Sequence, residues 1–147
     1  MAFTTPDVIP TFHYKDAPAA IDWLERAFGF ERHAVYEEDG VVHHAELRVG
    51  SNGMIMLGTA RENPYGMKTP NGSGVTGAVY VIVDEPDAHH DRAVAAGAEV
   101  IQELRDEDYG SRGYTSRDPE GHVWHFGTYR PAAQPGSQIT DHASQTL

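Results

Sequence analysis

The stretch "YKDAPAAIDWLERAFGFE", residues 14–31, decides the fold, because a related stretch follows as "IVDEPDAHHDRAVAAGAEV", residues 82–100. The two align without a gap at one offset of 68 residues. The matching pairs are Asp16 with Asp84, Pro18 with Pro86, Ala20 with Ala88, Ala27 with Ala95, Gly29 with Gly97 and Glu31 with Glu99. Six matches at one offset indicate an internal repeat.

Each copy has the start and stop residues of a helix. Asp16 and Asp84 are expected to be N-caps, and the proline two residues later fits the first turn, where its missing N–H costs little. Gly29 and Gly97 are expected to end the helices. The second helix has only a thin apolar face. The first has an apolar stripe at helical spacing, formed by Ala17, Ala20, Ile21, Leu24 and Phe28.

One strand candidate precedes each helix and three follow it. The candidates are residues 8–14, 30–39, 41–50 and 53–59 in the first copy, and 77–83, 98–104, 113–117 and 122–129 in the second. Asp39-Gly40 and residues 51–53 supply tight turns between strands of the first copy. Each half therefore reads β-α-β-β-β, which predicts an α+β fold.

The pattern also predicts the domain organisation. We expect a single domain over residues 1–130, with module 1 at about 7–60 and module 2 at about 76–130. The linker at residues 61–75 belongs to a stretch rich in Gly, Pro and Asn, which predicts a surface connection or a lid. Residues 131–147 are polar and without periodicity, so they are expected to form a flexible tail.

Composition narrows the function. The chain has 147 residues, no Cys and a formal charge of −11, which excludes disulfides, thiolate metal sites and a Cys nucleophile. The negative charge disfavours nucleic acid as a partner; it either attracts cationic small molecules or serves solubility alone. No apolar run is long enough to span a membrane and no secretory signal is visible, so a cytoplasmic location is expected. No nucleophile elbow, P-loop or dinucleotide fingerprint is present.

Two segments carry a family resemblance. "VIPTFHYKDAPAAIDWLERAFGFER", residues 8–32, and "YGSRGYTSRDPEGHVWHFGTY", residues 109–129, resemble the opening and closing segments of bleomycin-resistance-type members of the vicinal oxygen chelate superfamily. That superfamily also includes glyoxalase I and extradiol dioxygenases, and the resemblance covers residues 7–130. It implies a glyoxalase-like fold, in which two βαβββ modules form open mixed sheets around a cleft. It also implies a homodimer, with possible exchange of the N-terminal strand at a hinge at Pro10.

Enzymes of this superfamily hold one divalent metal at four positions, which the resemblance maps onto Ile9 or Pro10, Met56, Ala78 and His125. Such a site needs three or four N or O donors, and only His125 provides one. We therefore predict no metal and no cofactor. The alternative is a site rebuilt from His13, His125 and either His44 or Glu46.

The residues expected to face the cleft and bind a ligand are Thr11, His13, Met56, Ala78, Tyr80, Tyr109, Arg112 and His125. Tyr80 is suited to stack on a planar ligand, and Met56 either forms an adaptable wall or fills the core. Arg112 either borders the pocket or pairs with the acidic run before it. His125 is either a ligand contact or a structural histidine, whereas Trp124 points the other way and is expected to pack under the helices with Phe126.

These observations predict a metal-free binding protein of the bleomycin-resistance type, without catalytic residues. It would sequester an amphipathic or cationic drug or natural product in a cleft at the interface of a homodimer, with neither nucleic acid nor membrane as a partner. One alternative is a divergent metal-dependent lyase, isomerase or dioxygenase of the glyoxalase type. Another is a subunit or sensor whose cleft has no dedicated ligand.

Overall fold

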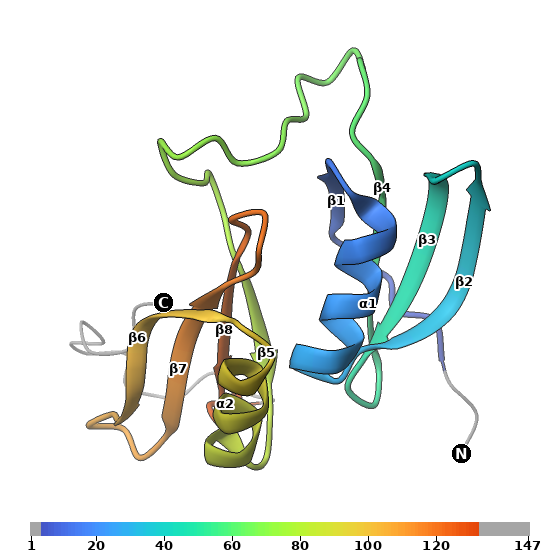
Figure 1. Cartoon of the computed structure of the whole chain (residues 1–147). Helices are drawn as coiled ribbons and strands as arrows, with labels where there is room; N and C mark the ends of the chain where they lie inside the picture. Colours follow the sequence, from blue (N-terminus) through green and yellow to red (C-terminus); the bar gives the residue numbers. More distant parts are fainter. Residues whose placement is uncertain (1–3, 133–147) are drawn as a thin grey trace.

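The computed structural model describes residues 4–132, so the tail predicted at residues 131–147 lies almost entirely outside the described residues. The chain forms two modules with the same order of elements (Figure 1). Module 1 contains β1 (Thr11–Tyr14), α1 (Ala17–Phe28), β2 (Glu31–Glu38), β3 (Val41–Val49) and β4 (Gly53–Thr59). Module 2 contains β5 (Val79–Ile82), α2 (Pro86–Ala95), β6 (Glu99–Asp106), β7 (Arg112–Arg117) and β8 (Val123–Gly127). In Figure 1 the green connecting segment, residues 60–78, arches from the end of β4 to the start of β5.

Each module has a four-stranded mixed sheet. The strand orders are β1-β4-β3-β2 and β5-β8-β7-β6, with β1 parallel to β4, β5 parallel to β8 and the other pairs antiparallel. The predicted α+β class with two βαβββ modules is therefore confirmed. β1 pairs with β4 of the same chain, and its exchange between two chains stays a prediction.

The positions of the buried side chains show that the two sheets are related by an offset one residue longer than that of the sequence alignment. Ile55 and Leu57 of β4 are buried, and so are Trp124 and Phe126 of β8. These positions are 69 residues apart rather than 68. The helix alignment therefore slips by one residue relative to the strands.

Helix α1 begins and ends as predicted. The side chain of Asp16 accepts a hydrogen bond from the N–H of Ala19 at 3.2 Å, and Gly29 ends the helix with φ of 76°. The helix packs one face against the sheet, where Ala17, Ala20, Ile21, Trp23, Leu24, Ala27 and Phe28 are buried. This confirms the predicted apolar stripe.

Helix α2 departs from the prediction. Its N-cap is Glu85, which makes no side-chain cap hydrogen bond, whereas the predicted cap Asp84 pairs with Arg130 at 3.2 Å. The reason is the longer offset, which places Glu85 at the position of Asp16. Only Pro86 and Ala93 of this helix are buried.

The two modules share one core. The ring of Phe28 lies 5.7 Å from Trp124 and 4.6 Å from Phe126, measured between ring centroids. The indole N–H of Trp23 donates to the carbonyl of Ala96 at 2.7 Å. Trp124 and Phe126 are fully buried there, which confirms their predicted packing under the helices.

Module 2 also caps both ends of α1. The Glu120 carboxylate accepts from the backbone N–H groups of Lys15 at 2.6 Å and Asp16 at 2.8 Å. At the other end, the guanidinium of Arg92 donates to the carbonyls of Arg26 at 2.7 Å and Glu25 at 2.9 Å. Helix ends leave such backbone groups without partners, and a carboxylate at the N-terminus and a cation at the C-terminus also suit the helix dipole.

The turn at residues 118–121 does more than set strand register. Asp118 Oδ1 accepts from the N–H groups of Glu120 and His122, as expected of a turn. Its Oδ2 accepts from the hydroxyl of Tyr14 at 2.6 Å and the indole N–H of Trp124 at 3.1 Å. Tyr14 belongs to module 1, so this buried carboxylate joins the modules.

His89 corrects the expectation that His89 and His90 lie on a solvated surface. Its Nδ1 hydrogen bonds with the hydroxyl of Tyr114 at 2.6 Å, and its Nε2 with the carbonyl of Phe28 at 3.1 Å. Burial lowers the pKa of His89 to about 4. His89 is therefore a neutral part of the module junction.

No helix of the described residues is long and apolar enough to cross a membrane.

Candidate ligand-binding site

A cavity at the open face of the second sheet is lined by four of the predicted ligand residues, Tyr80, Tyr109, Arg112 and His125. Tyr80, His125 and Thr115 form a row across β5, β8 and β7, while the neighbouring Trp124 and Phe126 face the core. The cavity, of about 200 Å³, lies over this row. Its lining includes Tyr80, Gln102, Arg105, Glu107, Tyr109, Arg112, Thr115, His125 and Tyr129. We name it the tyrosine pocket.

Three tyrosines form its aromatic wall. The ring of Tyr129 lies 5.4 Å from Tyr109 in an edge-on arrangement and 6.5 Å from Tyr80. The Tyr80 hydroxyl donates to the carbonyl of Tyr129 at 2.7 Å, which fixes the phenol in place. Burial, together with the neighbouring Tyr109, raises the pKa of Tyr80 to about 12, so the ring stays neutral at physiological pH.

His125 contributes a polar group at the pocket floor. Its Nδ1 hydrogen bonds with the Thr115 hydroxyl at 2.8 Å, and Nε2 forms no hydrogen bond within residues 4–132. Burial lowers the pKa of His125, so the imidazole is neutral near pH 7. This arrangement fixes the ring and leaves one nitrogen for a ligand.

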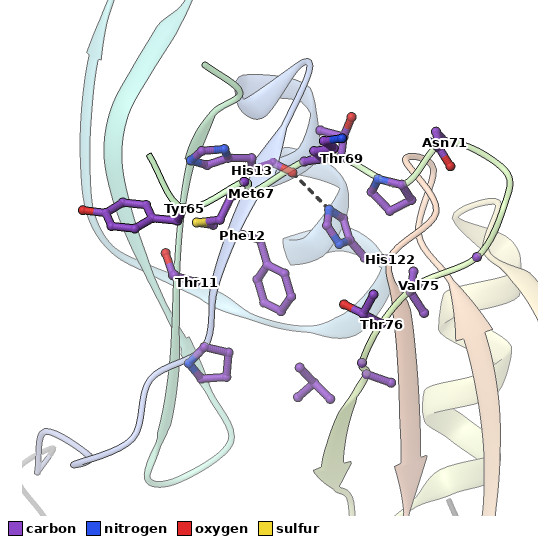
Figure 2. A pocket seen from close by; sticks show the side chains of 18 of the residues that line it. Thr11, Phe12, His13, Tyr65, Met67, Thr69, Asn71, Val75, Thr76 and His122 are labelled. Carbon is purple, nitrogen blue, oxygen red and sulfur yellow. Dashed lines mark hydrogen bonds between the residues drawn. The ribbon is translucent and has the colours of Figure 1, made fainter. Parts of the chain in front are cut away.

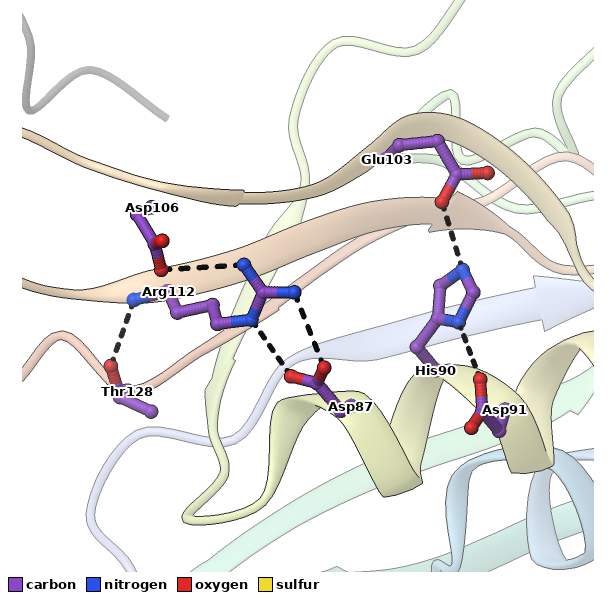
Figure 3. Close-up of polar contacts among 7 residues, drawn as sticks. All are labelled: Asp87, His90, Asp91, Glu103, Asp106, Arg112 and Thr128. Carbon is purple, nitrogen blue, oxygen red and sulfur yellow. Dashed lines mark hydrogen bonds and ion pairs between the residues drawn. The ribbon is translucent and has the colours of Figure 1, made fainter.

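The pocket arginines pair with carboxylates, and Figure 3 shows the contacts of Arg112. Arg112 Nε lies 2.8 Å from Asp87, and its Nη1 lies 3.3 Å from Asp106; these carboxylates raise its pKa above the ordinary value. Asp106 lies in the acidic run that the sequence offered as a partner, whereas Asp87 of α2 was not anticipated. Arg105 pairs with Glu107 at 2.6 Å. The charged rim of the pocket thus contains at least as many carboxylates as cations.

The first sheet presents a different open face. Its equivalent row is Thr11, Met56 and Glu46, across β1, β4 and β3. Glu46 lies 2.8 Å from the Nε2 of His44, whose ring stacks on Tyr36 at 6.1 Å. The predicted Met56 is half-buried on this face and lines neither of the two cavities that contain the other predicted residues.

The remaining predicted residues lie elsewhere. Thr11, His13 and Ala78 line a cavity of about 700 Å³ beneath the connecting segment (Figure 2). The eight predicted residues therefore divide between two cavities and one sheet face within the single chain.

The positions that the superfamily uses for metal do not fit an ion here. Pro10 and Ala78 line the cavity beneath the connecting segment and offer no side-chain donor, while Met56 and His125 lie on different sheets. The rebuilt site from His13, His125 and His44 or Glu46 is not assembled either. Within residues 4–132 no group of three or more His, Cys, Asp or Glu side chains is arranged to hold a metal.

The pocket residues missed from sequence include Tyr129 and Thr115. Tyr129 ends the motif "HVWHFGTY", and the sequence pattern predicts only the end of a strand there. Thr115 lies in the strand "GYTSR", and its pairing with His125 requires the register of β7 and β8. Counting outward from the β7–β8 turn in steps of two would have placed Thr115 beside His125.

Comparisons with known proteins agree with this architecture. The family model described as "Glyoxalase/Bleomycin resistance protein/Dioxygenase superfamily" matches residues 11–126. The uncharacterized protein Rv0887c of Mycobacterium tuberculosis is 36% identical over 127 residues, covering 83% of this chain and 74% of that protein. The crystal structure of TioX from Micromonospora sp. ML1 superimposes with a TM-score of 0.69 at 33% identity, covering 85% of this chain and 99% of TioX.

A member of the same superfamily from Sphaerobacter thermophilus matches in fold. Its TM-score is 0.67 at 18% identity, and the match covers 86% of this chain and 97% of the other.

Proposed function

The chain belongs to the glyoxalase/bleomycin resistance protein/dioxygenase superfamily, and on that premise we propose that it sequesters a small molecule. The ligand is an amphipathic, cation-bearing drug or natural product that binds in the tyrosine pocket. It is held there and released without chemical change.

The tyrosine wall is the observation that carries this proposal. Neutral aromatic faces attract a cation and also accept a planar apolar body. Tyr80, Tyr109 and Tyr129 supply such faces, and neutral His125 adds a hydrogen-bonding nitrogen without repelling a positive charge. The carboxylates around Arg112 and the formal charge of −11 favour the same ligand class.

A second copy of the chain completes the site in this proposal. The tyrosine pocket of one chain, about 200 Å³, is smaller than the roughly 300–1,000 Å³ typical of small-molecule sites. The open face of the first sheet of a second chain, with Glu46 and Tyr36, would close it and add a carboxylate opposite the tyrosines. We therefore propose a homodimer, in which exchange of the N-terminal strand would strengthen the contact.

The metal-dependent alternative lacks supporting observations. Lewis-acid chemistry requires several converging N or O donors. The mapped positions provide one imidazole, which is too few donors to hold a catalytic ion.

Binding of a metal-free bleomycin-type glycopeptide, measured by titration calorimetry in EDTA, tests the proposal. We expect one ligand per chain, and we expect Tyr80→Ala to weaken binding about tenfold or more because a buried aromatic contact is lost. Tyr65→Ala removes an 80% exposed tyrosine of the connecting segment and is the matched control, with unchanged affinity.

Three outcomes would contradict the proposal. The first is no binding by any of a panel of cationic glycopeptides, quinolines and anthracyclines. The second is binding that Tyr80→Ala leaves unchanged, and the third is a monomer by sedimentation at the concentration used for titration.

A further inference from the structure

The cavity beneath the connecting segment lies around β1, the edge strand of the first sheet. Figure 2 shows Thr11 and His13 on one side of this strand, beside Tyr65 and Met67, and Phe12 on the other side, toward His122. The apolar part of its lining consists of Pro10, Phe12, Met67, Pro70, Val75 and Val79. At about 700 Å³ the cavity is large enough for a small organic molecule.

The roof of this cavity is held by side-chain hydrogen bonds. The Asn63 amide group donates to the carbonyls of Arg61 and Met67, at 3.1 and 3.0 Å, and accepts from the N–H groups of Tyr65 and Met67, at 2.9 and 3.0 Å. Farther along, Pro70 packs against Gly121, where a Cβ would come within 3.1 Å of it. Four bonds to one amide and a packed proline give the segment a defined shape.

The charge of this cavity is opposite to that of the rest of the protein. The chain has 22 acidic residues, yet none of those within residues 4–132 lines the cavity, whereas Lys68 does. Arg61 lies close enough to His13 to contribute to the lowering of its pKa. Among residues 4–132 neither Lys68 nor Arg61 forms an ion pair, unlike Arg105 and Arg112 of the tyrosine pocket. Both side chains are exposed, and Arg61 lines a neighbouring cavity, but cations without carboxylate partners next to a cavity favour an anion there.

His13 has a buried ring nitrogen without a hydrogen-bond partner within residues 4–132, which also points to a ligand. It is only 6% exposed, and its Nδ1 is buried without a hydrogen-bond partner among the described residues. Buried polar atoms nearly always have hydrogen-bond partners. A buried nitrogen without one therefore indicates a position where a ligand or a water molecule binds. The backbone of His13 is already fixed, because its carbonyl accepts from His122 Nε2 at 3.0 Å. The residue that carries the orphaned nitrogen thus lies at a rigid position in the cavity wall.

We propose that this cavity binds a small organic acid, whose anionic group lies near Lys68 and Arg61 and hydrogen bonds with His13. The apolar body of the acid packs on Phe12, Val75 and Val79. The site is separate from the tyrosine pocket and has the opposite charge preference. It therefore does not depend on the function proposed above.

Three naphthalene isosteres that differ in charge test the assignment: 2-naphthoate, 2-naphthamide and 2-naphthylmethylammonium. Binding to the full chain is measured by NMR of ¹⁵N-labelled histidine side chains. We expect 2-naphthoate to bind most tightly and to shift the His13 ring nitrogens. Lys68→Gln should weaken 2-naphthoate about tenfold, because a charged contact is lost.

The chain has one other lysine, which gives a matched control. Lys15→Gln makes the same change of charge outside the cavity and should leave 2-naphthoate affinity unchanged. Tyr80→Ala should also leave it unchanged, although the same variant weakens the cationic ligand in the tyrosine pocket. The two proposals can therefore fail separately.

The proposal is overturned if 2-naphthoate does not bind, or if 2-naphthylmethylammonium binds as tightly. It is equally overturned if the shifts appear at His125 instead of His13, or if Lys15→Gln weakens binding as much as Lys68→Gln.

Discussion

The two modules have the same order of elements, but they differ in the contacts that stabilise them. Helix α1 buries seven side chains against its sheet and has both ends capped by module 2. Helix α2 buries two, and its N-cap residue makes no side-chain bond. The core beside Trp124 and Phe126 is filled largely by aromatic side chains of module 1, among them Phe28 and Phe30.

This difference shows that the repeat has become unequal. Module 1 supplies most of the shared core, and module 2 supplies the caps and the tyrosine pocket. A module whose stability comes from the junction can vary its open face without weakening its own core, which is consistent with a ligand-binding role for the second sheet.

Phe28→Ala is expected to have the largest effect and tests whether module 2 depends on the core side chains of module 1. This side chain of module 1 fills the core of module 2, and loss of a buried phenylalanine costs about 3–5 kcal/mol of the free energy of unfolding. Urea denaturation measures the loss, and amide hydrogen exchange should rise in β7 and β8. Val94→Ala in α2 is the counterpart, expected to cost less than about 0.5 kcal/mol because Val94 is 46% exposed. Equal losses in the two variants would refute the asymmetry.

The junction also makes a pH prediction through His89. Its pKa is about 4 in the folded protein and near 6.5 in the unfolded chain, so the unfolded chain binds a proton first as pH falls. The contribution of neutral His89 to the free energy of unfolding is complete above pH 6.5. It is lost as the pH falls toward 4, by about 3 kcal/mol in total. Urea denaturation at pH 7 and pH 4.5 should show a smaller pH-dependent loss in His89→Gln than in the parent protein.

His90 is the control for that measurement. It lies between α2 and β6, bonded to Asp91 and Glu103 (Figure 3). His90→Gln makes the same substitution at the neighbouring position of α2. If both variants change the pH dependence alike, His89 is not the group responsible.

The smallest effect concerns the helix caps. Asp16→Ala removes the bond to the Ala19 N–H and should lower the free energy of unfolding by about 1 kcal/mol. Asp84→Ala should have no measurable effect, because Asp84 is exposed and caps nothing. Thermal denaturation distinguishes the two variants. Equal shifts of the midpoint would instead support Asp84 as the N-cap of α2.

The repeat, both helices, all eight strands and the buried face of α1 could be predicted, because helix caps, glycine stops and apolar spacing are local signals. The start of α2 could not, because aligning Asp84 with Asp16 hides a one-residue shift, which is seen only in the N-caps and in the buried positions of the strands. His89 was misassigned because the aromatic groups that bury it belong to distant segments, Phe28 among them.

The candidate site was predicted only in part. Alternation along β5 and β8 placed Tyr80 and His125 on one face, as their pairing shows. Alternation along β1 likewise put Thr11 and His13 on one side of the strand. It gave no sign that the connecting segment covers them in a separate cavity, because the path of a long irregular segment has no periodic signal.

The bond between Glu120 and the start of α1 has a consequence for assembly. Glu120 recognises backbone N–H groups, so α1 of another molecule would offer it the same partners as its own α1. Covalent tethering by the connecting segment gives the module of the same chain a high local concentration, which favours the contact within one molecule. Deleting residues 66–74 should therefore produce open-ended module swapping, seen as a sedimentation coefficient that grows with protein concentration.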